Sequence, residues 1–182
     1  SMKQYIIDPA TRLGFNDYYL AQKINVRWAS PWLNDIRSKD YNRYLDEAAE
    51  QVAAGLIYWR DKYKIVPRYE MLFKEPLSGT PSLLNGNTHD VVDLVKRVGD
   101  RLRREGFVDV KFVIPNEETE EKSLATATAL LSDPAARQYV GALGYYTHYQ
   151  DSDFGLLQLG VRLYDPETGR FTQRDAIKDA PN

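Results

Sequence analysis

The residues best suited to chemistry in this chain are acids that follow strand-like segments. Residues 69–73 form a short, mostly apolar strand-like run that leads into Lys74, Glu75 and Pro76. Proline cannot continue a strand and restricts the residue before it, so we expect the Glu75 carboxylate where the strand ends. Active sites of parallel α/β folds gather at strand ends, which makes Glu75 a candidate acid or base. The simpler alternative is an ordinary solvated Glu.

A second group of acids follows another strand-like segment. Residues 109–114 alternate as a strand and run into Pro115, Asn116, Glu117 and Glu118. Either of these two acids, also at a strand end, could approach Glu75 and form a pair of carboxylates with it. The alternative is that they are solvated acids at the start of the next helix, where the helix dipole favours negative charge.

The elements that must position these acids alternate between strands and helices. A strand is predicted at 24–28 and another at 140–145, on either side of the two described above. Helical spacing of apolar residues predicts helices over 40–62 and from 88 to a stop at Gly106, followed by short ones at 123–131 and 134–139. This order predicts an α/β fold with a parallel sheet, either part of a barrel or open and doubly wound.

The two ends of the chain are predicted to differ from the middle. Residues 3–22 suggest a hairpin around an Asp-Pro turn signal, and residues 155–164 suggest a strand that turns at 165–169 and returns. We therefore expect three parts, with an N-terminal hairpin segment at 1–22, an α/β domain at 23–150 and a C-terminal hairpin and tail at 151–182.

Composition narrows the range of partners. The 182 residues carry a net charge of -2, so no basic field favours nucleic acid or anionic lipid. The absence of cysteine excludes disulfides and thiol chemistry, and with two histidines we expect no metal or other cofactor. No apolar run reaches the length of a membrane span, and no signal peptide is recognisable, so no membrane partner is expected and the cellular compartment stays open.

Four segments of the middle region carry a family resemblance. They read Trp-Ala-Ser-Pro-Trp at 28–32, Tyr-Glu-Met-Leu-Phe-Lys-Glu-Pro at 69–76, Phe-Val-Ile-Pro-Asn-Glu-Glu at 112–118 and Asp-Pro-Ala-Ala-Arg-Gln-Tyr-Val-Gly-Ala at 133–142. In order and spacing, residues 24–150 resemble the middle of glycoside hydrolase family 30, the glucosylceramidase-like barrels. The resemblance implies part of a (β/α)₈ barrel, a β-glycoside substrate hydrolysed with retention, and Glu75 as the acid/base.

The resemblance also implies a sugar site at the strand ends. Aromatic and polar side chains there would stack on a sugar and hydrogen bond to it. The candidates are Trp28, Trp32, Lys74, Asn116, Glu117, Tyr145, Tyr146 and His148.

The chain departs from the family pattern in three places. Lys74 stands where the family has Asn, and its ammonium favours an ionised carboxylate, the wrong direction for a general acid. Tyr145 and Tyr146 stand where the family has a His-aromatic pair. The segment that would carry the family nucleophile has no counterpart here, and 182 residues fall short of the roughly 250 of a closed barrel. We therefore expect an incomplete or impaired glycosidase.

The ends resemble a different family. Two segments, at 4–16 and 159–177, are similar to Rhs/YD-repeat core segments. They read Gln-Tyr-Ile-Ile-Asp-Pro-Ala-Thr-Arg-Leu-Gly-Phe-Asn and Leu-Gly-Val-Arg-Leu-Tyr-Asp-Pro-Glu-Thr-Gly-Arg-Phe-Thr-Gln-Arg-Asp-Ala-Ile. Two alternatives to a glycosidase follow. One is a non-catalytic chimeric module that associates with itself, or with a complementing chain, through exposed sheet edges. The other is an Rhs-associated domain.

Overall fold

A parallel β-sheet with sequential strand order is the framework of the protein. The computed structural model describes residues 7–14, 19–20, 31–73, 75–77, 87–114, 117, 119–144, 149–150, 157–159, 162–165 and 170–171. The sheet runs in the order β1 (Tyr19–Leu20), β2 (Tyr69–Glu70), β3 (Lys111–Val113) and β4 (Val140–Ala142), with all neighbours parallel. The predicted α/β fold with a parallel sheet is therefore confirmed.

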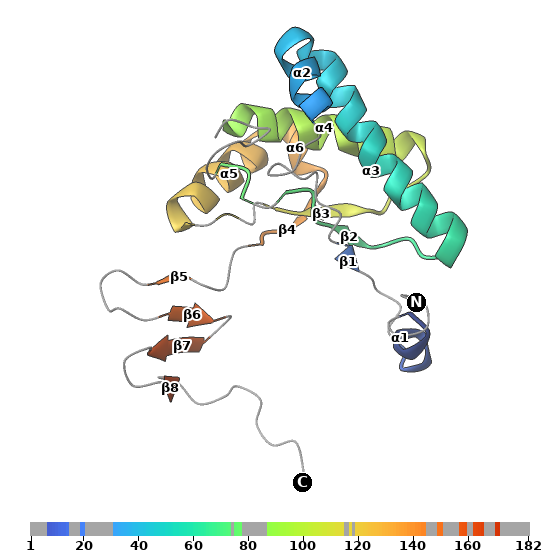
Figure 1. Ribbon diagram of the computed structural model, residues 1–182. Coiled ribbons are helices and arrows are strands. Elements are labelled where there is room, and N and C mark those ends of the chain that lie inside the picture. The colour runs from blue at the N-terminus through green and yellow to red at the C-terminus, as the bar shows by residue number, and fades with distance from the viewer. Residues whose placement is uncertain are drawn as a thin grey trace.

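The strand order fixes where the helices lie. Parallel strands that follow one another in sequence and in space, joined by right-handed crossovers, place every crossover helix on the same side of the sheet. Figure 1 shows α2 to α6 gathered on one side of β1–β4. The order does not reverse among the described strands, so they contain no doubly wound switch point. β1 and β4 are the two edges of this sheet, and the described strands form no closed barrel.

Each of the two long helices begins after a capping residue. α3 (Tyr41–Tyr63) begins after Asp40, whose side chain accepts the Arg43 N–H at 3.0 Å. α4 (Thr88–Arg104) begins after Asn87, whose side chain accepts the His89 N–H at 2.9 Å. These contacts satisfy N–H groups that have no partner within a helix, and the predicted starts of both helices are confirmed to within one residue.

Three shorter helices complete the layer. α2 (Pro31–Lys39) precedes α3, and α5 (Glu120–Ser132) begins after the N-cap Thr119. α6 (Pro134–Arg137) begins after Asp133, which accepts the N–H groups of Ala135 and Ala136. The predicted helices at 123–131 and 134–139 are thus confirmed, with α5 starting three residues earlier.

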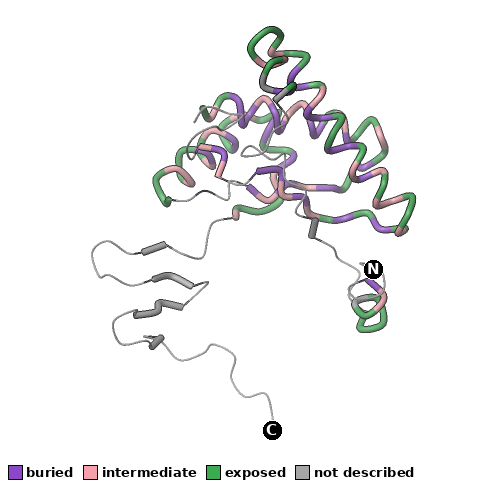
Figure 2. The backbone as a smooth tube through the Cα atoms, in the orientation of Figure 1, coloured by how far each residue is buried: buried purple, intermediate pink, exposed green. Residues whose placement is uncertain are grey.

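The core lies between the helix layer and one face of the sheet (Figure 2). Along β3 and its flanks, Val110, Phe112 and Ile114 are buried, whereas Lys111 and Val113 between them are half-buried. Alternate strand residues point to opposite faces, so one face packs on the helices and the other is more open. The helices contribute mainly small and branched side chains, namely Ala48, Ala49, Val52, Ala53, Leu56, Val91, Leu94, Val95, Val98 and Leu102.

The N-terminal prediction is wrong. Residues Asp8–Arg12 form a short helix, α1, and β1 pairs in parallel with β2, so residues 3–22 do not make a hairpin. The Asp8-Pro9 pair begins a helix because proline lacks only an N–H that has no partner in the first helical turn. The predicted strand at 24–28 lies outside the described residues.

A second sheet, near the C-terminus, is antiparallel, with the order β5 (Tyr149–Gln150), β6 (Leu157–Leu159), β7 (Arg162–Asp165) and β8 (Arg170–Phe171). The hairpin of β7 and β8 was predicted and is confirmed. The single strand predicted over 155–164 is wrong, because β6 and β7 pair with each other. Only Gly160 and Val161 separate paired residues, a spacing and composition typical of a two-residue hairpin connection.

The contact of α4 with the segment before β4 depends on Gly99. A Cβ at this position would lie 2.5 Å from ring atoms of Tyr139. Gly to Ala in a helix is ordinarily stabilising by about 1 kcal/mol. Here we expect Gly99→Ala to lower the free energy of unfolding by about 1 to 3 kcal/mol, because overpacking outweighs propensity. Urea denaturation measures the change, and in a Tyr139→Ala background Gly99→Ala should cause no further loss.

Candidate functional site

Glu75 lies in a turn five residues beyond Glu70, the last residue of β2. Its φ is +55°, and among the described residues other than glycine only Lys64 shares a positive φ. This left-handed conformation is uncommon for a residue with a side chain and must be imposed by its surroundings. Glu75 is half-buried, and Pro76, which follows it, is buried. Glu75 thus follows β2 in the chain, as predicted, but the strand is shorter than the predicted 69–73 and ends at Glu70, five residues before Glu75.

The turn is bonded to a buried acid from the neighbouring crossover. The Leu77 N–H donates to the Glu117 carboxylate at 2.8 Å, and the Thr126 hydroxyl on α5 lies 3.5 Å from the same oxygen. Glu117 is 0% exposed. The contact therefore ties the loop after β2 to the chain after β3 and to α5.

This geometry changes the interpretation of Glu117. The alternative of a solvated acid at the start of a helix is wrong, because the side chain is buried and α5 begins later, at Glu120. As the partner acid for Glu75, or as a group that binds a sugar, Glu117 would have to act from a fully buried position. What the structure shows it doing is accepting hydrogen bonds from protein donors.

The remaining predicted site residues are only partly described. Trp32 lies in α2 and not at a strand end, and 51% of it is exposed. The expectation that it ends a strand is therefore wrong, and its contact with a sugar stays a prediction. The other candidates lie outside the described residues, namely Trp28, Lys74, Asn116, Tyr145, Tyr146 and His148.

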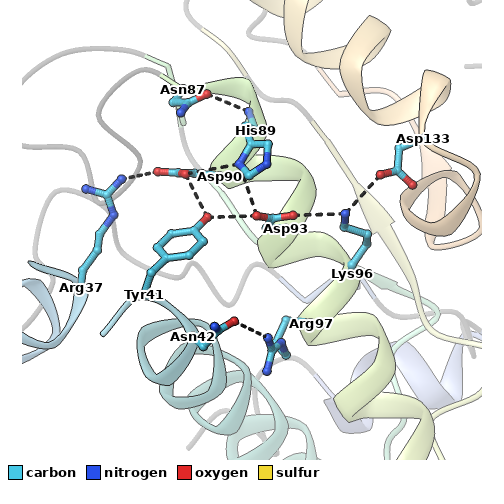
Figure 3. A network of polar contacts seen from close by, with 10 residues as sticks. All are labelled: Arg37, Tyr41, Asn42, Asn87, His89, Asp90, Asp93, Lys96, Arg97 and Asp133. Atoms are coloured by element: carbon cyan, nitrogen blue, oxygen red, sulfur yellow. Dashed lines mark hydrogen bonds and ion pairs between the residues drawn. The ribbon is translucent and has the colours of Figure 1, made fainter. Parts of the chain in front are cut away.

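A polar cluster that the sequence did not predict lies at the N-terminal half of α4 (Figure 3). Asp90 is buried there, and it accepts hydrogen bonds from the Arg37 guanidinium of α2 and, at 2.9 Å, from the Tyr41 hydroxyl of α3. Tyr41 also lies 3.3 Å from Asp93. A hydroxyl has one proton, so it donates to one of these two carboxylates at a time. Burial and both acids raise the pKa of Tyr41 far above its ordinary value.

The cluster continues along α4 towards α6. Lys96 lies 3.1 Å from Asp93 and 3.2 Å from Asp133, the N-cap of α6, while His89 Nδ1 lies 3.3 Å from Asp93. The hydrogen bond from the Ala136 N–H and the ion pair with Lys96 lower the pKa of Asp133. The i, i+3 spacing of the two aspartates and the lysine was visible in the sequence, but their partners on other helices were not.

The polar contacts of this cluster hold α2, α3 and α4 together. Its buried carboxylate is matched by a guanidinium and a hydroxyl, which offsets the cost of taking the charge out of water. A second line of ion pairs joins α3 and α4, with Arg97 on Asp46 at 2.6 Å and Arg101 on Glu50 at 2.7 Å. Two arginines of α4, Arg97 and Arg101, thus hold this helix against acids of α3.

Within the described ranges, no three His, Cys, Asp or Glu side chains are grouped so that they could hold a metal ion. The helices there include none that is long and apolar enough to cross a bilayer.

Comparison with known proteins gives no assignment. No protein-family model matches this chain, and no curated protein matches it. A function has to be argued from the geometry together with the residue patterns.

The pair of Arg37 and Asp90 should matter more than the exposed ion pair on the same helix. We expect Arg37→Ala to lower the free energy of unfolding by about 2 kcal/mol, because it removes a partner of a buried carboxylate. Lys39→Ala is the matched control. Lys39 pairs with Asp35 at 2.7 Å, but both side chains are exposed, so a loss of about 0.5 kcal/mol or less is expected. Equal losses in urea denaturation would contradict this assignment.

Proposed function

We propose that this chain is a glycoside-hydrolase-type domain of the retaining β-glycosidase kind, with Glu75 as its acid/base. The observation that carries the proposal is the place of Glu75, in a turn beyond the carboxyl end of β2, with a left-handed backbone. The sequential parallel sheet with its helices on one side supports it, because a (β/α)₈ barrel is built from the same repeating unit and keeps its active site at this edge. The resemblance to family 30 favours the same residue.

The proposed enzyme is catalytically impaired. Retaining hydrolysis requires a second carboxylate as nucleophile, about 5 Å from the acid/base. Of the two acids predicted near this edge, Glu117 is buried and bonded to Leu77 and Thr126, and Glu118 lies outside the described residues. The four strands also correspond to half the number in a closed barrel, so strands and a nucleophile from another chain would complete the site.

Slow hydrolysis of an aryl β-glycoside tests the proposal. We expect Glu75→Gln to lower the rate of phenol release by about 100-fold or more, the usual effect of losing general acid–base catalysis. Glu121→Gln is the control, because Glu121 is an exposed acid on α5. Equal turnover by wild type and Glu75→Gln would remove Glu75 from the mechanism. A wild type that neither cleaves β-glycosides nor binds them in calorimetry would overturn the proposal.

A second candidate function is self-association through the sheet. β1 and β4 are its edge strands, and edge strands carry backbone groups that can pair with another chain. The face away from the helices is partly open: Tyr69, Lys111 and Gly141 lie together on it, since a Cβ on Gly141 would meet the side chains of the other two. Leu143, just beyond β4, is 52% exposed. Two copies, with β4 of each pairing with β1 of the other, would give eight strands.

Light scattering coupled to size-exclusion chromatography tests this second candidate. We expect a dimer for the wild type, and a monomer for Leu143→Lys, because the new charge would be buried at the contact. Val108→Lys is the control, since Val108 is also exposed but precedes β3, at the opposite end of the strands. A wild type that is monomeric over the whole concentration range would exclude this function.

A further inference from the structure

We propose that Glu117 is the positioning residue of Glu75, holding the turn at 75–77 through the Leu77 N–H. The proposal deepens the proposed function and rests on it for the role of Glu75 as the acid/base. It assigns to Glu117 no contact with substrate. Its content is that the left-handed backbone of Glu75 persists because the buried carboxylate fixes the end of the turn.

The covalent chemistry of the turn makes Leu77 the natural anchor. Pro76 has no backbone N–H, so the N–H of Leu77 is the first backbone donor after Glu75. That donor is taken by the Glu117 carboxylate at 2.8 Å. Pro76, which stands between Glu75 and Leu77 in the sequence, is buried, and its ring confines its own φ. One hydrogen bond therefore fixes the chain two residues beyond the acid.

A carboxylate suits this role for two reasons. An ionised acceptor makes shorter and stronger hydrogen bonds to backbone N–H groups than a neutral one does. It is also costly to bury without donors, so Glu117, which is 0% exposed, strongly favours the arrangement in which Leu77 and Thr126 lie next to it. A slipped or relaxed turn would take the Leu77 N–H away from the buried Glu117 carboxyl group.

The left-handed backbone of Glu75 also depends on contacts around the turn. A left-handed conformation at a residue with a side chain persists only where neighbouring contacts determine it. Glu75 has φ +55° and directly precedes a proline, which further limits its conformations. The contact of Glu117 with Leu77 lies on the far side of that proline. This contact is therefore placed to fix the turn from which the Glu75 side chain extends.

NMR of three variants of the whole chain tests the proposal without any need for activity. In Glu117→Ala, we expect hydrogen exchange of the Leu77 amide to accelerate by about tenfold or more, as for loss of a bond to a charged acceptor. We also expect the Glu75 Cα and Cβ shifts to leave their left-handed values. Glu117→Gln keeps an acceptor oxygen and should restore both signals towards wild type. Glu121→Gln, an exposed acid nearby, should change neither.

Each other result contradicts the proposal. Leu77 exchange in Glu117→Ala within about twofold of wild type would show that the contact does not protect this amide. Faster exchange with unchanged Glu75 shifts would show that the contact does not govern the turn. If Glu117→Ala fails to fold, Glu117→Asp replaces it, because a side chain one methylene shorter withdraws the acceptor, and the same two criteria apply. Turnover unaffected by Glu75→Gln would sink the proposed function alone and leave these outcomes standing.

Discussion

The fold depends on the burial of one helix layer against one face of a small parallel sheet. α3 and α4 meet through small and branched side chains, including Ala49, Val52, Val95 and Val98, and the same cluster continues into Leu72, Phe112 and Ile114 near the strand ends. Apolar burial of this kind is the main favourable term in folding. Because the strands are only two or three residues long, their ladders contribute little, and the helices hold the sheet in place.

Three buried acids are the main departures from this apolar core. Asp90, Glu117 and Glu70 lie inside the protein, and an acid in such a place costs free energy unless donors surround it. Asp90 accepts from Arg37 and Tyr41 and so connects α2, α3 and α4, while Glu117 accepts from Leu77 and connects two crossovers. These contacts specify how the layers align, which apolar packing alone leaves less defined.

Sequence patterns predicted the helices and strands better than they predicted the contacts between them. Helical periodicity predicted α3, α4, α5 and α6, because this signal is local and is contained within a few turns of the chain. The N-terminal hairpin was wrong because Asp-Pro signals a turn and a helix start equally well, and only the pairing of β1 with β2 distinguishes them. Trp32 was misplaced for the same reason, since Pro31 begins α2.

The sequence by itself determined the α/β class, the extents of the two long helices and the place of Glu75 before Pro76, which follow from periodicity and the chemistry of proline. Only the tertiary structure decided what Glu117 does. The sequence offered Glu117 as a site residue or as a solvated acid. In the structure it is buried and accepts a hydrogen bond from Leu77, 40 residues earlier. The cluster around Asp90 likewise joins residues some 50 positions apart. Such contacts depend on how the layers pack, and no local pattern of residues specifies that.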